Sequence, residues 1–484
     1  VAAYKSLKND YLKMVGNAPA VAKKKMEEAF ALENRIAKVS YDQVKSRDPQ
    51  ANYHPMTWEQ LLKDYPGIDW NYILKIAGYP NNGGKVDVGQ PEPVHEVEKI
   101  LATAPLDQLK AYMELAVISS SAGMLSDAFS KRKFEYTKVA YGVQQQQPRW
   151  KRALSFVQGI MGEAVGKLYV QKYFPESSKE RMVQLVKNLQ SAFAQRIEEN
   201  TWMTAATKAK ALEKLQAFDI KIGYPDKWQN MDSVFVIDEA KSLLDNVKNV
   251  QEAASKYIIS KRWGKPVDKK LWHMTPQTVN AYYDPSTNSI NFPAAILQPP
   301  FFDPEVDDAA NYGAIGAVIG HEMSHGFDDQ GCQFDKEGNM KNWWTDEDKK
   351  NYDARTKVLV DWFNQQEVIP GLKVNGEKTL GENIGDNGGL NVAYRALENS
   401  MKQNPLTDKD GFTPSQRFFL AWGRVWASNV APQFVAYIVN SDVHSPNVSR
   451  VNAALPMIDA WYKAFDIKEG DKLFVPQEKR AHIW

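Results

Sequence analysis

Three residues in the second half of this sequence have the types and spacing of a metal-dependent hydrolytic site. His321, Glu322 and His325 form an H-E-x-x-H motif. On a helix, residues four positions apart lie on one face, so the two imidazoles can reach a single metal ion. Glu322 can then act as a general base on a metal-bound water, which is the arrangement that zinc peptidases use. Because the chain has only seven histidines, chance would produce this motif in about one such chain in a hundred.

The residues that precede the motif indicate a buried helix. Positions 313–320 read GAIGAVIG, a run of small and apolar side chains. Two histidines and a glutamate on a buried helix need partners, because unpaired polar groups are costly in the protein interior. A metal ion is the simplest common partner. A metal site is therefore favoured over the alternative of three polar residues on a solvated helix face.

The position of a third ligand separates the classes of zinc peptidase. A metzincin would have glycine at 328 and histidine at 331, whereas this chain has Asp328 and Gly331. Thermolysin-like enzymes supply a glutamate about twenty residues after the second histidine, but Trp344 and Thr345 occupy those positions. Glu347 lies among other acids and two lysines, which is typical of the solvated start of a helix.

Glu382 and Asp386 are better candidates for the metal site. They belong to the segment GENIGDNGGL at 381–390 and lie four positions apart, hence on one helix face. One carboxylate can bind the metal while the other accepts a ring N–H from a ligand histidine, which fixes the tautomer of that histidine. The alternative is a pair of surface acids on an amphipathic helix.

The elements that must position these residues are mainly helices. Apolar residues recur at helical spacing through much of the chain. Helices are predicted over 23–39, 150–173, 178–200, 204–217, 345–366, 382–400, 414–430 and 451–466. Loops are predicted at 80–84 and 144–148, which are rich in residues that break helices.

Two short strands precede the metal motif. Segments 279–283 and 290–292 read as strands around a turn at 284–288. Before them, the residues GYP at 223–225 interrupt the helical pattern and place a domain boundary near 205–225. The length of the chain suggests two domains, or one large domain with a lid.

The composition narrows the class of protein further. The formal net charge of +1 gives no reason to expect a nucleic acid or an anionic membrane as partner. Cys332 is the single cysteine, so internal disulfides are excluded. No apolar run approaches the roughly 20 residues of a membrane span. Hydrophobic residues make up 43% of the chain, enough to build a core.

Further motifs accompany the metal motif in a fixed order. They are VNAYY at 279–283, FPA at 292–294, ILQPPFF at 296–302, VIGHEMSHGFDD at 318–329, GENIGDNGGL at 381–390, DVHSP at 442–446 with Arg450, and the terminal Trp484. In type and order they resemble the neprilysin family of zinc endopeptidases, which includes the endothelin-converting enzymes and bacterial oligopeptidases. The resemblance covers about 280–484 closely, and weaker similarity extends back through Trp202, Met203 and the segment YHPMT at 53–57.

The resemblance implies a role for each residue of the metal site. His321, His325 and Glu382 would bind one Zn²⁺ per chain. Glu322 would be the general base and proton shuttle, and Asp386 would orient His321. Cobalt or manganese could replace zinc in vitro, although two histidines and a glutamate with one open position suit zinc best.

The resemblance also implies which residues meet the substrate. His444 would stabilise the oxyanion, and Arg450 would hydrogen-bond a substrate carbonyl beyond the scissile bond. Asn280 and Ala281 would bind the substrate backbone as a strand edge. A hydrophobic pocket for the residue after the cut would be lined by Ile296, Phe301, Val318, Val425 and Trp426.

For the fold, the resemblance implies a mainly α protein with a small β component. A zincin-like (thermolysin-like) catalytic domain over 226–484 would follow a helical lid domain over 1–205 and a linker region over 206–225. Family members carry about 150 further N-terminal residues, so the lid would be incomplete. We therefore expect a fragment, a processed product, or a lid completed by a missing segment or a second polypeptide.

Two departures from the family pattern bear on the source and the site. Gly385 stands where alanine is usual, which costs helix stability but no ligand. The many cysteines of the animal enzymes are absent, which favours a bacterial-type member. We expect an extracytoplasmic protein, secreted or periplasmic, with the bacterial cytoplasm as the alternative.

The functional hypothesis is a zinc-dependent endopeptidase that acts on oligopeptides. It would cut on the N-terminal side of bulky hydrophobic residues, using a zinc-bound water activated by Glu322. The alternative is a catalytically silent or incomplete peptide-binding module of the same fold. The complete set of ligands and base argues against that alternative, because a decayed enzyme is expected to lose Glu322 or one ligand.

Overall fold

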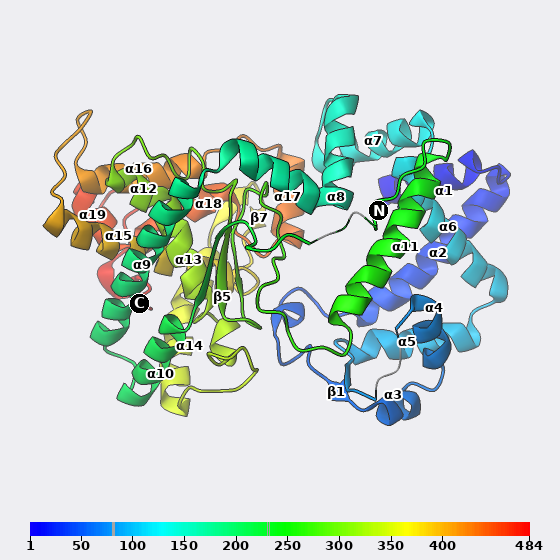
Figure 1. The fold of residues 1–484 in the computed structure, drawn as a ribbon, viewed down its shortest axis with the longest axis horizontal. Helices are drawn as coiled ribbons and strands as arrows, with labels where there is room; N and C mark the ends of the chain where they lie inside the picture. Colours follow the sequence, from blue (N-terminus) through cyan, green and yellow to red (C-terminus); the bar gives the residue numbers. More distant parts are fainter. Residues whose placement is uncertain (80–82, 230, 232) are drawn as a thin grey trace. The chain divides into compact units, whose positions relative to one another are not determined.

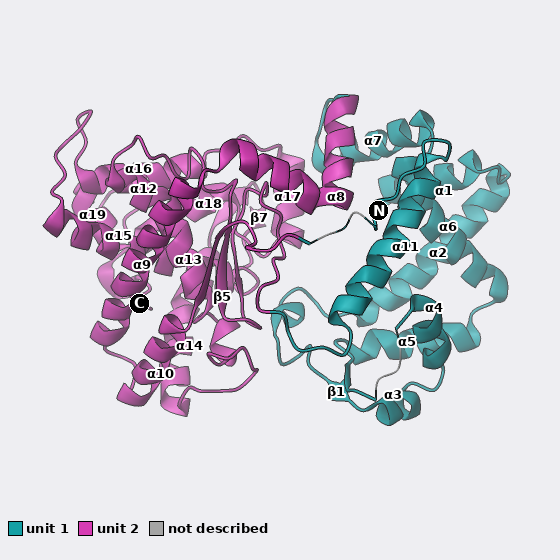
Figure 2. Cartoon of the chain, in the orientation of Figure 1, with its two compact units in different colours: residues 1–148, 229–268 teal, residues 149–228, 269–484 magenta. Residues whose placement is uncertain are grey.

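The computed structural model describes residues 1–79, 83–229, 231 and 233–484. They form two compact units, each assembled from two separate stretches of sequence (Figure 2). Unit 1 comprises residues 1–148 and 229–268, and unit 2 comprises residues 149–228 and 269–484. The chain therefore passes from one unit to the other near residues 148, 228 and 268.

Unit 1 is mainly helical (Figure 1). Its helices are α1 (Ala2–Met14), α2 (Pro19–Val39), η1 (Lys45–Arg47), α3 (Trp58–Asp64), α4 (Trp70–Ala77), α5 (Pro91–Thr103), α6 (Leu106–Ser121), η2 (Ala122–Met124), α7 (Asp127–Tyr141) and α11 (Leu243–Arg262). Strand β1 (Pro55–Met56) pairs antiparallel with β2 (Val86–Asp87). Helices α1, α2 and α6 pack together and bury Leu12, Ala22 and Leu115 in one hydrophobic cluster.

Unit 2 contains the other helices and the larger sheet. Its helices are α8 (Arg149–Tyr173), α9 (Glu176–Glu199), α10 (Ala205–Gln216), α12 (Asp308–Asn311), the π-helix η3 (Tyr312–Gly316), α13 (Ala317–His325), η4 (Gly331–Gln333), α14 (Asp346–Phe363), α15 (Leu380–Gln403), α16 (Pro414–Val425), α17 (Pro432–Ser441), α18 (Asn447–Asn452), η5 (Leu455–Met457), α19 (Asp459–Phe465) and η6 (Gln477–Lys479). The expected fold class, mainly α with a small β component, is confirmed. Among the described residues, no helix combines the length and apolar character needed to cross a membrane.

A three-stranded sheet lies beside the helix that carries the H-E-x-x-H motif. The strand order is β3 (Asp219–Gly223), β5 (Ser289–Pro293) and β4 (Tyr282–Asp284), with β3 parallel and β4 antiparallel to β5. Every residue of the central strand β5 is buried, and α13 contacts both β4 and β5. The predicted strand pair is confirmed. Strand β3 is not predicted, because its residues lie within the expected linker and its partner is seventy positions away. A separate pair, β6 (Glu367–Ile369) and β7 (Leu372–Lys373), is antiparallel.

Helices α13 and α15 pack unusually close together, because glycines face each other at their contact. A Cβ atom at Gly320 would lie 2.9 Å from the Cα atom of Gly389, and one at Gly389 would lie 2.4 Å from the carbonyl oxygen of Ala317. Real Cβ atoms do not approach that closely. The glycines therefore let the two backbones approach, which brings the polar side chains of α13 within reach of those of α15.

A buried carboxylate joins the starts of α10 and α14. Asp348 is fully buried and accepts hydrogen bonds from the backbone N–H of Thr204 (2.7 Å) and from the hydroxyls of Thr204 (2.7 Å), Thr207 (2.6 Å) and Thr345 (2.6 Å). Burial alone would raise the pKa of Asp348, but these donors hold it below its ordinary value. Because Thr204 and Thr345 cap the two helices, one side chain anchors both of them.

The compact units differ from the expected division at 206–225. Residues 149–205, expected in the helical lid, belong to unit 2, because α9 presents an apolar stripe that includes Val186, Leu189 and Phe193 and packs against α15. Residues 229–268, expected in the catalytic domain, belong to unit 1 and include α11. A stripe of apolar residues shows that a helix is buried, but not which distant helix covers it.

Two predicted helices also differ from the structure. The expected helix over 451–466 is broken into the end of α18, η5 and α19. Pro456 lies within η5, and proline lacks the backbone N–H that a continuous helix requires. The expected helix over 414–430 ends at Val425. The predicted loop at 144–148 is present, whereas the one at 80–84 falls largely outside the described residues.

Candidate active site

Helices α13 and α15 bring the three predicted metal ligands together in unit 2. The Nε2 atoms of His321 and His325 are 2.9 Å apart. The Oε2 atom of Glu382 lies 3.1 Å from Nε2 of His321 and 3.4 Å from Nε2 of His325. Ligand atoms of all three residues lie within 4.8 Å of one another. The spacing of four residues within α13, and the first turn of α15, produce this cluster.

A carboxylate lies behind each histidine ring. Asp386 accepts a hydrogen bond from Nδ1 of His321 (2.9 Å), and Asp328 accepts one from Nδ1 of His325 (2.7 Å). An ionised carboxylate only accepts, so each neutral imidazole carries its proton on Nδ1. In the neutral form of each ring, which is the form that binds a metal, the Nε2 atom therefore presents a lone pair toward Glu382.

This donor set fits a divalent metal ion. With both rings neutral, two lone pairs and a carboxylate oxygen converge on one point, where a bound cation satisfies all three. In a tetrahedral zinc site with bonds of about 2.0–2.1 Å, ligand atoms stand about 3.3 Å apart, close to the separations seen here. Two histidines and one glutamate are also a known catalytic zinc set. The residues present therefore suit zinc.

Asp328, which is not among the predicted site residues, contacts a predicted ligand. The residue directly follows the H-E-x-x-H-G-F run and lies three positions after His325. This closeness in sequence to a predicted ligand is the feature by which the sequence could have indicated it. Its other carboxylate oxygen accepts the backbone N–H groups of Gln330 (2.9 Å) and Gly331 (2.6 Å). The carboxylate is thus held by its own loop while it orients the ring.

We expect Asp328→Asn to weaken zinc binding about 10–100-fold, the usual effect of losing an outer partner of a ligand histidine. An amide nitrogen at this position would favour the wrong His325 tautomer, with the proton on Nε2. Competition with a chromophoric chelator measures the zinc dissociation constant. Asp408→Asn, an exposed change of the same kind, is the control, and equal affinities for both variants would contradict the prediction.

The proposed general base, Glu322, is buried next to the ligands. It is 5% exposed and follows His321 directly on α13. Burial raises the pKa of its carboxyl, and the imidazoles of His321 and His325 lower it in part, so that the net direction is upward. A carboxylate whose proton affinity is raised is a better proton acceptor near neutral pH.

His444 joins the cluster from the loop between α17 and α18. Its Nε2 atom lies 3.1 Å from Oε2 of Glu382, and its Nδ1 atom lies 2.8 Å from Oδ1 of Asp442. Burial alone would lower the pKa of His444, but these two carboxylates raise it to about 9. The hydroxyl of Ser445 donates to Asn383 (2.8 Å), which attaches this loop to α15. Asp442, like Asp328, is not among the predicted site residues, although it lies in the DVHSP motif.

Arg450 lies deeper than its predicted role suggests. It is 7% exposed and donates two hydrogen bonds to Asp386, from Nε (2.9 Å) and from Nη2 (2.7 Å). Its guanidinium carbon lies 3.7 Å from the centre of the Trp426 ring. A continuous polar chain therefore runs from Arg450 through Asp386 to His321. Burial alone would raise the pKa of Asp386, but the guanidinium of Arg450 and the imidazole of His321 hold it below its ordinary value.

The predicted substrate-binding residues lie around the sheet and the core of unit 2. Asn280 and Ala281 directly precede β4, which is one of the two edge strands of the sheet. The predicted pocket residues share one hydrophobic cluster, in which two are buried (Ile296 and Val318) and three are partly buried (Phe301, Val425 and Trp426). Trp426 is joined to the metal site through its contact with Arg450.

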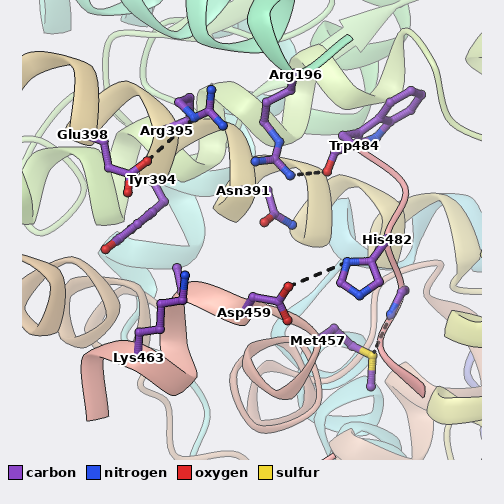
Figure 3. A pocket seen from close by; sticks show the side chains of 12 residues that line it. Arg196, Asn391, Tyr394, Arg395, Glu398, Met457, Asp459, Lys463, His482 and Trp484 are labelled. Carbon is purple, nitrogen blue, oxygen red and sulfur yellow. Dashed lines mark hydrogen bonds and ion pairs between the residues drawn. The ribbon is translucent and has the colours of Figure 1, made fainter. Parts of the chain in front are cut away.

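A hollow elsewhere in unit 2 contains no predicted site residue. It has a volume of about 290 Å³, and charged side chains that include Arg196, Arg395, Asp459 and Lys463 line it (Figure 3). Arg196 donates a hydrogen bond to the carbonyl oxygen of Trp484 at its edge. Burial and the nearby Arg395 lower the pKa of Arg196 to about 10.

Comparisons with known proteins identify the family of this chain. Residues 1–225 match the N-terminal model of peptidase family M13, and residues 280–481 match its second model. The chain is 34% identical to neutral endopeptidase of Lactobacillus helveticus, over 98% of this chain and 71% of that protein. It is 32% identical to human neprilysin, over 95% of this chain and 64% of that protein. The zinc metalloprotease Zmp1 of Mycobacterium tuberculosis, solved with an inhibitor, has a similar structure with a TM-score of 0.94 at 40% identity, over 100% of this chain and 74% of that one.

The fold, together with a His₂Glu cluster beside a buried glutamate, defines a metallopeptidase of the neprilysin type. The chain belongs to peptidase family M13. The resemblance seen in the sequence is thereby confirmed, although the chain spans only part of the length of its relatives.

Proposed function

We propose that this protein is a zinc-dependent endopeptidase that hydrolyses oligopeptides on the N-terminal side of bulky hydrophobic residues. The observation that carries the proposal is the convergence of His321, His325 and Glu382 on one point, with the carboxylate of Glu322 buried on the same helix. Such a cluster is costly in the interior unless it binds a cation.

When bound by these three residues, zinc would act as a Lewis acid, polarising the scissile carbonyl and making water more acidic. Glu322 accepts a proton from the attacking water while the water oxygen bonds to the carbonyl carbon. Glu322 then passes that proton to the leaving amine nitrogen as the C–N bond breaks. Asp386 and Asp328 hold the two ligand histidines in the tautomer that this chemistry needs.

His444 stabilises the charge that develops on the carbonyl oxygen. Its Nδ1 atom is engaged by the carboxylate of Asp442, which favours a protonated ring whose Nε2–H can donate. Arg450 holds Asp386 in place and offers its remaining N–H groups to a substrate carbonyl. Arg450 is buried, and hydrogen bonds to developing charge are strongest where water is excluded.

The substrate backbone would lie along the edge of the sheet. An extended peptide can add to an exposed strand edge through main-chain hydrogen bonds. Asn280 and Ala281 precede β4, an edge strand. The hydrophobic side chain after the cut would fit among Ile296, Phe301, Val318, Val425 and Trp426.

A mass-spectrometric digest of a mixed peptide library near neutral pH tests the proposed function. We expect cleavage before Phe, Leu, Ile and similar residues, and no such products from Glu322→Gln. Peptide binding without cleavage by the unchanged chain would instead support a silent binding module. Cleavage without preference for the following residue would overturn the proposed pocket.

We expect His444→Ala to lower kcat on the order of 100-fold, as typically follows loss of one oxyanion donor. The zinc content should stay unchanged, because His444 is not one of the three ligands. Steady-state kinetics and metal analysis of the same preparation check both parts. His482→Ala, which removes a half-exposed histidine, is the control; a loss of zinc from H444A would show that its role was misassigned.

A further inference from the structure

Lys214 is a buried lysine whose partners are backbone carbonyls. It lies near the end of α10 in unit 2 and is 1% exposed. Its ammonium group donates to the carbonyl oxygens of Gly326, Gly331 and Phe334, each at 2.7 Å. Three acceptors match the three N–H donors of a protonated amine. The residue therefore uses its full donor capacity on one short segment of chain.

Placing an ammonium group in the interior is unfavourable. Burial lowers the pKa of Lys214 to about 7, because desolvation disfavours the charged form. A neutral side chain of similar shape, such as methionine, would fill the space without that cost. The three hydrogen bonds indicate that the position of the segment 326–334 matters.

That segment links the metal helix to the carboxylate behind its second histidine. Gly326 follows His325 and the end of α13, where helix carbonyls lack intrahelical partners and favour a nearby cation. Asp328, which accepts from His325, lies between Gly326 and Gly331. Lys214 therefore holds the loop on both sides of Asp328. The rings of Phe327 and Trp343 pack about the ammonium group, 5.7 and 5.8 Å away.

We propose that Lys214 is a positioning residue for the metal site. By fixing the carbonyls of Gly326 and Gly331, it sets the position of Asp328, and Asp328 sets the direction in which Nε2 of His325 points. Lys214 acts through this loop and does not touch the ligands. The inference rests on the proposed metal site, but not on peptide hydrolysis, so it can be tested on binding alone.

Lys214→Met tests the inference through metal binding. We expect zinc affinity to fall about 10–100-fold, as for other losses of an outer partner. With Co²⁺ as a probe, the visible absorption bands should shift, because His325 would meet the metal at a different angle. Zinc affinity within twofold of the unchanged chain, together with an unaltered cobalt spectrum, would overturn the proposal.

Asp348→Asn separates positioning from simple stabilisation. Asp348 joins the same helix, α10, to α14 through buried hydrogen bonds, but it does not hold the 326–334 loop. D348N should lower the melting temperature while zinc affinity and the cobalt spectrum stay unchanged. If D348N weakens zinc binding as much as K214M does, Lys214 contributes only stability and the proposal fails.

The double variant Lys214→Met/Asp328→Asn tests the route through Asp328. Residues that act through one another give non-additive effects, so the double variant should bind zinc no more weakly than D328N alone. If the fold-loss in zinc affinity of the double variant equals the product of the two single losses, Lys214 does not act through Asp328. If K214M does not fold, Lys214→Arg answers the same question, because its planar group keeps the charge but cannot reproduce three equal contacts. A folded K214R with an unchanged cobalt spectrum would count against the proposal.

Discussion

Replacing Glu322 by glutamine is expected to lower kcat by about 10²–10⁴-fold, the range supplied by a positioned acid–base group. Glutamine has nearly the same shape, but its amide cannot take a proton from water and pass it to the leaving amine. The three ligands are untouched, so zinc should remain bound. Because the substrate-binding residues are also unchanged, KM should change little. Kinetics on a peptide identified from the library, with metal analysis of the same sample, measure all three quantities.

The matched control for this prediction is Glu347→Gln. Glu347 is exposed at the start of α14, as the sequence predicts. Its replacement by glutamine makes the same chemical change away from the site. E347Q should keep full activity. A Glu322→Gln variant that retains more than about a tenth of the activity would fall outside the range for a general base and would remove Glu322 from that role.

Replacing Glu382 by alanine is expected to abolish stable zinc binding, and activity with it. The change deletes one of three predicted protein ligands, a carboxylate that faces three imidazoles, those of His321, His325 and His444. The loss of affinity should exceed the roughly 10–100-fold cost of removing an outer partner. Dialysis followed by metal analysis, and calorimetric titration with zinc, check the result.

Thermal unfolding gives a second measurement of the same prediction. A ligand that binds only the folded state at 1,000 times its dissociation constant stabilises that state by about 4 kcal/mol. Zinc added to the chelator-treated protein should therefore raise the melting temperature of the unchanged chain and leave that of E382A nearly unaffected. Glu398→Ala, an exposed change on the same helix, should respond like the unchanged chain. An equal zinc-dependent shift in E382A would exclude Glu382 as a ligand.

The two largest predictions depend on residues that the sequence alone identifies. The histidines of α13 lie four positions apart, as do Glu382 and Asp386 on α15, and helical periodicity places such pairs on one face whatever the rest of the fold does. The apolar run before the motif similarly indicates burial. The order of motifs along the chain supplied the family, and with it the zinc set and the fold class. Each of these features is local, or depends on the order of local segments.

Other features could not be predicted, because they join residues that are far apart in the sequence. Arg450 meets Asp386 across 64 positions and Lys214 reaches Gly331 across 117. Strands β3 and β5 pair within unit 2, although residues 229–268, which separate them in the sequence, belong to unit 1. A local sequence pattern shows that a side chain is buried or charged, but not which distant residue forms its hydrogen bonds or balances its charge. That choice is made when helices and strands pack, since only tertiary contact brings the desolvated groups together.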